Sequence, residues 1–177
     1  MRTIIGLGVA AAAFACLGGA ASAHVTLEQK EATVGGGYKA VLKVPHGCKG
    51  APTNTVRVRI PEGMIAVRPM PKPGWKLETV KGPYAKTYDF YHNAKLSEGV
   101  KEVVWSGGDL PDEFYDEFVL SGFLTADLPA NTTLFFPVVQ ECPGGAAERW
   151  IEVPKGGEQP SSLEKPAPGL KLLPKQP

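Results

Sequence analysis

Three histidines and three cysteines are the side chains of this 177-residue sequence that are best suited to metal chemistry. They are His24, His46, His92, Cys16, Cys48 and Cys142. Imidazole nitrogen suits copper and zinc, and thiolate sulfur suits Cu(I) and zinc. The sequence has no P-loop, dinucleotide fingerprint, nucleophile elbow or zinc-finger spacing, so it gives no support for nucleotide or hydrolase chemistry.

The first 23 residues are typical of a cleaved export signal. Arg2 supplies a positive charge, residues 4–17 form an apolar run, and Ala21-Ser22-Ala23 fits the small-residue cleavage rule. Cleavage after Ala23 would remove Cys16 and leave 154 residues that begin at His24. We therefore expect a periplasmic protein. The alternatives are a retained anchor, for which the run is short, and a lipoprotein, for which a Leu three residues before Cys16 is missing.

His24 would then be the first residue of the mature chain. A histidine in that position offers its α-amino nitrogen and its own ring Nδ1 to one metal, which suits a tetragonal nitrogen site for Cu(II). An unprocessed or acetylated chain cannot form this chelate. The amine must lose its proton to bind, so affinity should fall as the medium turns acidic. The alternative is that His24 simply follows the cleavage site.

His46 is the natural second ligand, because it lies at the end of an expected strand in Pro45-His46-Gly47-Cys48. The alternative for His46 is a loop histidine that bonds to backbone. His92 is expected to be an exposed turn residue. After cleavage Cys48 and Cys142 are an even pair, which in an oxidising compartment favours a disulfide. The alternative is a pair of soft copper ligands.

Alternation of apolar and polar residues is the dominant pattern of the mature chain, and it predicts half-buried strands. The predicted strands are 38–44, 55–60, 75–80, 84–91, 100–105, 116–125, 133–140 and 149–153. Gly and Pro clusters separate them, as turns between antiparallel strands require. We expect one all-β domain, an antiparallel β-sandwich of cupredoxin-like or immunoglobulin-like type. A helical turn at 112–116 is the one expected exception.

The domain organisation follows from these patterns. Residues 1–23 are the signal peptide, 24–155 the sandwich, and 156–177 a Pro-rich strap and tail in which Leu170, Leu172 and Leu173 would form one edge strand. The mature chain would carry 18 basic and 18 acidic residues. This balance gives no support for a nucleic-acid or anionic-membrane partner.

Seven ordered motifs run through the mature chain: HVTL at 24–27, VPHGC at 44–48, PKPGWKL at 71–77, VWSGG at 104–108, FPVVQEC at 136–142, WIEVP at 150–154 and PAP at 166–168. Together these motifs resemble the YcnI-like family of exported bacterial copper-binding proteins. The resemblance implies a β-sandwich with one copper site on the N-terminal His, near an acidic side chain and a tryptophan. His24 and Trp150 match that pattern. Trp150 would shield the metal as a lid, or else serve only in packing.

One position departs from the family pattern. Where some members carry Glu after the Val-Pro turn, this sequence has Gly47, preceded by His46. We therefore prefer a two-histidine site with three nitrogens, namely the His24 amine, the His24 ring and the His46 ring. Should the site include a carboxylate, the candidates are Glu28 and Glu141.

The function expected from these features is a periplasmic copper chaperone or buffer. It would hold one Cu(II) and pass it to a copper transporter or another copper chaperone, without being an enzyme. Two alternatives are a copper oxygenase with a histidine brace, since that chelate also serves in polysaccharide oxidation, and a structural sandwich without metal.

Overall fold

The computed structural model describes residues 24–175, so the expected signal peptide lies outside the described residues. Twelve strands occur in the described part. They are β1 (Thr26–Leu27), β2 (Glu31–Thr33), β3 (Gly36–Val44), β4 (Thr53–Arg59), β5 (Met64–Pro69), β6 (Lys76–Phe90), β7 (Ala94–Leu110), β8 (Asp116–Leu124), β9 (Thr133–Phe135), β10 (Val138–Glu141), β11 (Ala147–Trp150) and β12 (Gly169–Leu173). Across these residues, no helix is both long and apolar enough to cross a membrane.

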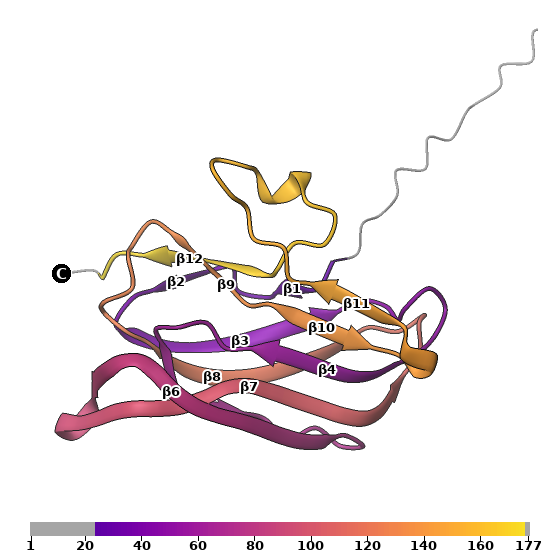
Figure 1. The fold of residues 1–177 in the computed structure, drawn as a ribbon, viewed down its shortest axis with the longest axis horizontal. Coiled ribbons are helices and arrows are strands. Elements are labelled where there is room, and N and C mark those ends of the chain that lie inside the picture. Colours follow the sequence, from indigo (N-terminus) through magenta and orange to yellow (C-terminus); the bar gives the residue numbers. More distant parts are fainter. Residues whose placement is uncertain (1–23, 176–177) are drawn as a thin grey trace, which may run out of the picture.

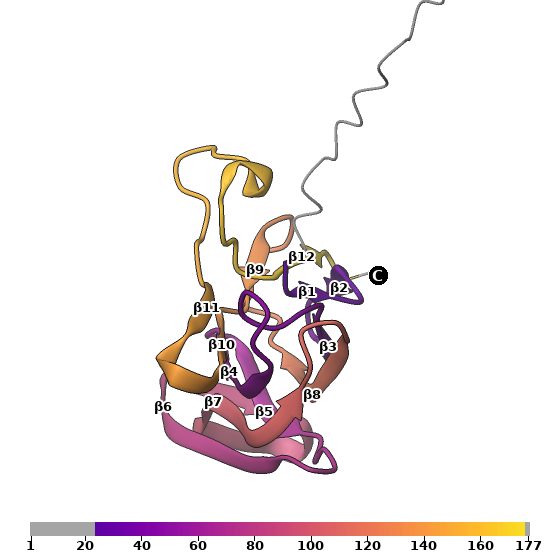
Figure 2. The same ribbon diagram turned by 90° about the vertical axis from the view of Figure 1, so that its right-hand side faces the viewer.

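The strands form three sheets that enclose one main core. A four-stranded sheet has the order β1-β3-β8-β5, a five-stranded sheet has the order β11-β10-β4-β7-β6, and a small sheet has the order β2-β12-β9. Figures 1 and 2 show the two larger sheets as layers, with the small sheet above them beside β1. The expected all-β sandwich is confirmed.

The alternation of inward and outward side chains along the strands determines which residues form the core. In β3, Tyr38, Ala40, Leu42 and Val44 are all buried, and Leu42 lies opposite Phe118 of β8. Burial raises the pKa of the Tyr38 hydroxyl to about 12. Each fully buried Leu or Phe of such a row contributes about 1.5–3 kcal/mol relative to an exposed one, so the sandwich is stabilised mainly by these inward faces.

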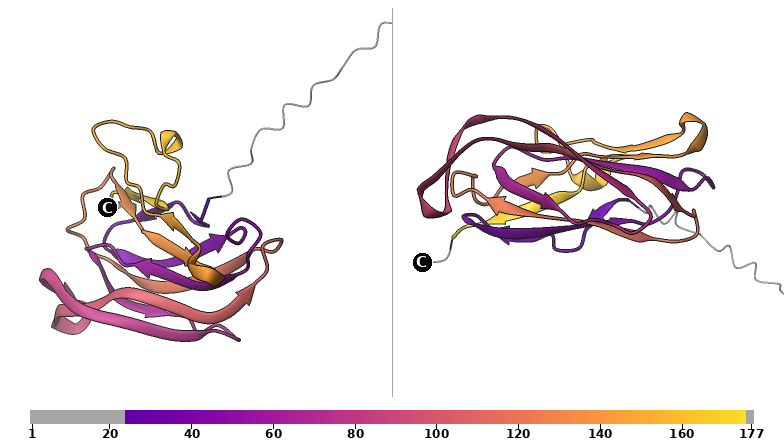
Figure 3. Two further views of the ribbon diagram at one scale, coloured as in Figure 1. Left: turned by 45° about the vertical axis from the view of Figure 1, so that its right-hand side comes forward. Right: turned by 90° about the horizontal axis from the view of Figure 1, so that it is seen from below.

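All eight predicted segments contain strand residues, but several boundaries differ. Segments 75–80 and 84–91 form the single strand β6, whose long hairpin with β7 runs along one face of the molecule (Figure 3). The segment 133–140 is divided into β9 and β10 around Phe136 and Pro137, and Pro137 has no N–H to donate to a ladder. The expected helical turn at 112–116 is wrong, because only Asp112 and Glu113 form a turn, which is not helical, and Asp116 is the first residue of β8.

The strand near the C-terminus is not at an edge, so that prediction is wrong. β12 lies between β2, with which it pairs in parallel, and β9, with which it pairs antiparallel. Leu170 and Leu172 are fully buried in the main core. Because β2 supplies a second partner, the N-terminal and C-terminal segments stabilise each other.

A long connection joins β11 to β12 and projects from the sandwich, as the yellow loop in Figures 1 and 2 shows. It returns to the body through a short bridge between Glu152 and Pro166. The ammonium of Lys165 also bonds to the carboxylate of Glu148 on β11. These contacts bring the base of the connection close to the N-terminal segment.

Glu62, in the turn between β4 and β5, connects that turn to the β6–β7 hairpin. Its carboxylate accepts hydrogen bonds from Lys101 Nζ (2.7 Å), the Tyr88 hydroxyl (2.8 Å) and the Ala85 N–H (3.0 Å). Burial raises the pKa of Glu62, but these hydrogen bonds together outweigh burial, so the pKa is below its usual value. The charged form of Glu62 therefore stabilises the fold.

Glu62→Gln should lower the free energy of unfolding by about 1–2 kcal/mol at pH 7, because three donors lose a charged acceptor. A carboxyl group whose pKa is lower in the folded than in the unfolded state stabilises the fold above its unfolded pKa, and this stabilisation is lost as the pH falls. The difference in unfolding free energy between Glu62→Gln and wild type should therefore shrink below about pH 4. Urea unfolding at pH 7 and pH 3 measures both effects. Glu98→Gln, at an exposed position on β7, is the control. A Glu62→Gln difference that persists at pH 3 would contradict the charge-based account.

Candidate metal centre

Trp150 brings the two candidate histidines together. It lies on β11, opposite Val138 of β10, and its side chain is buried. The ring centroid of His24 is 5.4 Å from that of Trp150, and the centroid of His46 is 6.3 Å away, both with edge-to-face geometry. His24 and His46 thus both contact the indole of Trp150.

A buried amide fixes this arrangement. Gln140, on β10, is fully buried and accepts a hydrogen bond from the indole Nε1 of Trp150 at 3.3 Å. Its Nε2 donates to the carbonyl of His46 and to the Thr53 hydroxyl, the latter at 2.6 Å. One side chain therefore holds both the loop of His46 and the indole that contacts the two histidines.

A disulfide between Cys48 and Cys142 ties the same loop to the end of β10, with the two Cα atoms 6.1 Å apart. The expected disulfide is confirmed, and a bridged pair offers no thiolate to a metal. Gly47 is required beside it, because a Cβ atom there would lie 1.9 Å from the carbonyl oxygen of Ala51. The loop is therefore short, tightly packed and cross-linked.

The tautomer of His46 follows from its hydrogen bond. Its Nδ1 lies 2.6 Å from the carbonyl oxygen of Gly47. A carbonyl oxygen only accepts, so Nδ1 carries the proton and Nε2 carries the lone pair in the neutral ring. Metal-binding histidines are commonly oriented in this way, with the other ring nitrogen bonded to backbone.

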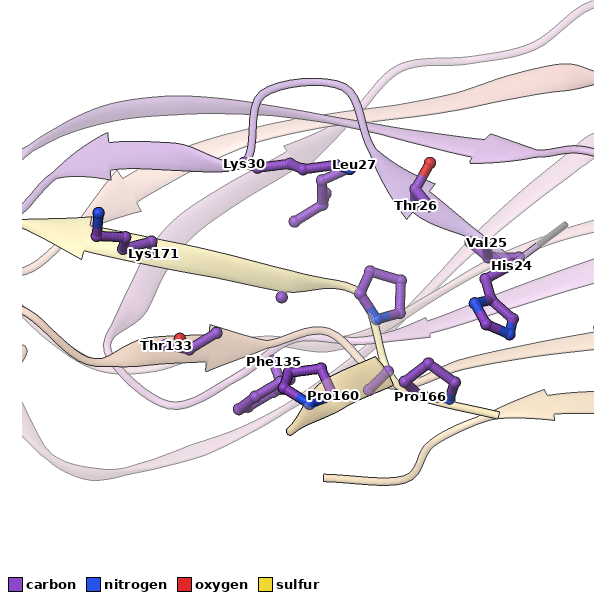
Figure 4. A pocket seen from close by; sticks show the side chains of 13 residues that line it. His24, Val25, Thr26, Leu27, Lys30, Thr133, Phe135, Pro160, Pro166 and Lys171 are labelled. Carbon is purple, nitrogen blue, oxygen red and sulfur yellow. The ribbon is translucent and has the colours of Figure 1, made fainter. Parts of the chain in front are cut away.

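His24 lies at the start of the described chain, at one end of a cavity of about 270 Å³. Figure 4 shows its imidazole beside Pro166, with Lys171 at the far end of the cavity. Val25 is buried and Thr26 pairs with Lys43 of β3. The backbone that follows His24 is therefore fixed by strand pairing and by the core.

The two candidate carboxylates do not join the histidines. Glu141 lies on the face of β10 opposite to that of Gln140, and it accepts a hydrogen bond from Arg57 Nε at 2.7 Å. Glu28 lies 4.0 Å from Lys43 and is half-exposed. Within residues 24–175, no group of three His, Cys, Asp or Glu side chains is close enough to hold one metal ion. Glu28 and Glu141 each form an ion pair with a basic side chain.

The remaining histidine is where it was expected. His92 is exposed in the short 3-10 segment η1 (Tyr91–Asn93) at the tip of the β6–β7 hairpin, with φ 58°. Sequence reasoning missed Gln140 and Thr53. Their signal was alternation, since Val138, Gln140 and Cys142 share the inward face of one strand and a buried glutamine there requires partners.

Comparison with known proteins gives the family. Residues 24–172 match the family described as "Domain of unknown function (DUF1775)". The chain belongs to this family. No curated protein matches the DUF1775 chain.

One solved structure similar to this DUF1775 chain is that of an uncharacterized protein from Nocardia farcinica, described as having an immunoglobulin-like fold. The TM-score is 0.61 at 26% sequence identity, and the match covers 85% of this chain and 98% of the other. The immunoglobulin-like architecture expected from the sequence is therefore confirmed. The family match begins at His24 and ends at Leu172, within β12.

Gln140→Leu should lower the free energy of unfolding by about 3 kcal/mol, because it leaves the His46 carbonyl, the Thr53 hydroxyl and the Trp150 indole N–H without this partner in a buried place. Urea unfolding of the metal-free protein measures this loss. Gln159→Leu changes the same residue type at an exposed position and should stay within about 0.5 kcal/mol of wild type. Equal stability of the two variants would show that the Gln140 network does not hold the loop.

Proposed function

We propose that this DUF1775 protein is an exported copper carrier of the YcnI-like type. In this proposal the signal peptide 1–23 is removed in the periplasm, the mature chain starts at His24, and one Cu(II) binds as cargo. The protein passes the copper to a membrane transporter or to another copper chaperone. The observation that carries the proposal is the convergence of His24 and His46 on the indole of Trp150.

The number of nitrogen donors supports a metal site that becomes complete only after cleavage before His24. His24 and His46 supply two imidazoles, and no carboxylate or cysteine among residues 24–175 joins them as a third side-chain donor. An α-amine on His24 would add a third nitrogen in the same residue as one of the rings. Three nitrogens suit the tetragonal preference of Cu(II). Before cleavage this nitrogen is part of a peptide bond and cannot coordinate.

The start of the family match supports the same boundary. Similarity to DUF1775 begins at His24, the residue that the cleavage rule makes the first of the mature chain. Position 47 also has a physical reason to differ from the family members with Glu, because the Ala51 carbonyl leaves no room for a Cβ atom. With no acidic side chain at that position, His46 takes the role of the second ligand in our proposal.

Trp150 is proposed to shield the metal. Its indole is buried, it is held by Gln140, and it contacts both rings edge to face. An aromatic face near a cation adds about 0.5–2 kcal/mol of attraction, depending on how dry the site is. The rigid loop of His46 and the rigid indole would let copper bind without reorganising the sandwich.

The amine is tested by one added residue. A mature chain with a single Ala ahead of His24 keeps every side chain but loses the α-amine from the chelate. Its affinity for Cu(II) should fall at least about 100-fold, equivalent to about 2.7 kcal/mol, in a competition titration against a chelator. The same Ala added after Pro177 is the control. Equal affinity of the N-terminally extended and mature chains would exclude the chelate.

The second imidazole is tested by His46→Ala, with His92→Ala as a matched control at the exposed hairpin tip. The electron paramagnetic resonance spectrum of the Cu(II)-loaded mature protein should report one fewer nitrogen donor for His46→Ala and no change for His92→Ala. An unchanged spectrum for His46→Ala would leave a site with one histidine only.

A further inference from the structure

The outer face of the five-stranded sheet carries three arginines on neighbouring strands. Arg57 of β4 and Arg149 of β11 both lie opposite Val139 of β10, one on each side of it. Arg59 follows two residues after Arg57 on β4 and therefore projects from the same face. This is the face opposite to that of Gln140 and Trp150.

The three arginines differ in their ion pairs. Arg57 bonds to Glu141 at 2.7 Å and to Glu102 at 3.5 Å, and the hydrogen bond with Glu141 raises the pKa of its guanidinium. Arg59 and Arg149 have no carboxylate within 4.0 Å in the described part of the chain. Glu102 is opposite Arg59 in the sheet, but its carboxylate bonds to Arg57. Within the described chain, Arg59 and Arg149 therefore form no ion pair, and the three guanidiniums exceed the two carboxylates, Glu102 and Glu141, by one charge.

These side chains surround a cavity of about 330 Å³, which we call the arginine hollow. Its apolar lining comes from Pro137, Val139 and Ile151, and Ile151 is 44% exposed although it is a large aliphatic residue. The hollow therefore presents apolar surface between guanidinium groups, which suits a ligand that carries both carbon atoms and carboxylates.

The spacing defines the ligand. Neighbouring strands lie about 4.8 Å apart and residues of one strand about 3.4 Å apart, so the backbones of Arg59 and Arg149, two strands and two residues apart, are separated by roughly 12 Å. A guanidinium binds a carboxylate through two parallel hydrogen bonds. Carboxylates joined by a short carbon chain could reach Arg59 and Arg149 while the carbon atoms cover Val139 and Ile151.

We propose that the arginine hollow binds an organic polyanion, in which two or more carboxylates are joined by a short hydrocarbon segment. The same chemistry is offered by a free di- or tricarboxylic acid and by the acidic side chains of a peptide segment. The site does not use the histidines, so it is independent of copper binding.

The test is a titration of the metal-free chain 24–177 at constant ionic strength, followed by amide chemical shifts. One arm uses citrate, and a second uses the capped peptide Glu-Leu-Glu. Saturable shifts should be confined to residues near Arg59, Val139 and Arg149. The arm with the tighter binding identifies the source of the carboxylates.

The double variant Arg59→Gln with Arg149→Gln should weaken binding at least about tenfold, since it removes both guanidiniums that have no ion pair. Arg68→Gln with Lys81→Gln removes the same charge at exposed positions elsewhere and should leave binding unchanged. Equal weakening in both double variants, or an equal response to inorganic phosphate, would reduce the effect to general charge and overturn the proposal. Absence of saturable shifts in both arms would also overturn it.

Discussion

The side-chain amide of Gln140 is the interaction on which the candidate site depends. It satisfies a carbonyl, a hydroxyl and an indole N–H that would otherwise be buried without this partner. The cost of leaving such groups unpaired in the interior fixes the relative positions of the His46 loop and Trp150. The disulfide from Cys48 to Cys142 fixes the same loop covalently, so a hydrogen bond and a covalent bond both hold the loop of His46.

The other half of the site depends on how the chain begins and ends. β2 and β9 both pair with β12, and β1 pairs with β3, so the segment after His24 is held by strands from both ends of the chain. A terminus created at His24 would therefore be delivered to Trp150 and not to open solvent. Proteolysis and folding would act together, because cleavage would create the α-amino nitrogen of His24 and strand pairing would hold that nitrogen in position.

Much of the sandwich could be predicted from alternation, since every second residue of strands such as β3 and β8 faces the core. The site could be predicted only in part. His24, His46 and Trp150 carried a chemical or motif signal, whereas the one signal of Gln140 was its inward position in the alternation of β10. The same alternation places Glu141 on the opposite face from Gln140, where it bonds to Arg57. β5 was missed because Ala66, at φ 51°, interrupts its alternation with a bulge.

The two faces of β10 thus carry the two proposed sites, the copper site on the inner side and the polyanion site of the arginine hollow on the outer side. The claim on which the account depends is that copper binds where the chain starts. A crystal structure of the processed, Cu(II)-loaded protein, with copper located by its anomalous scattering, tests this claim most directly. The account predicts one copper at bonding distance, about 2 Å, from the His24 amine, His24 Nδ1 and His46 Nε2. Copper bound away from the His24 amine would contradict it.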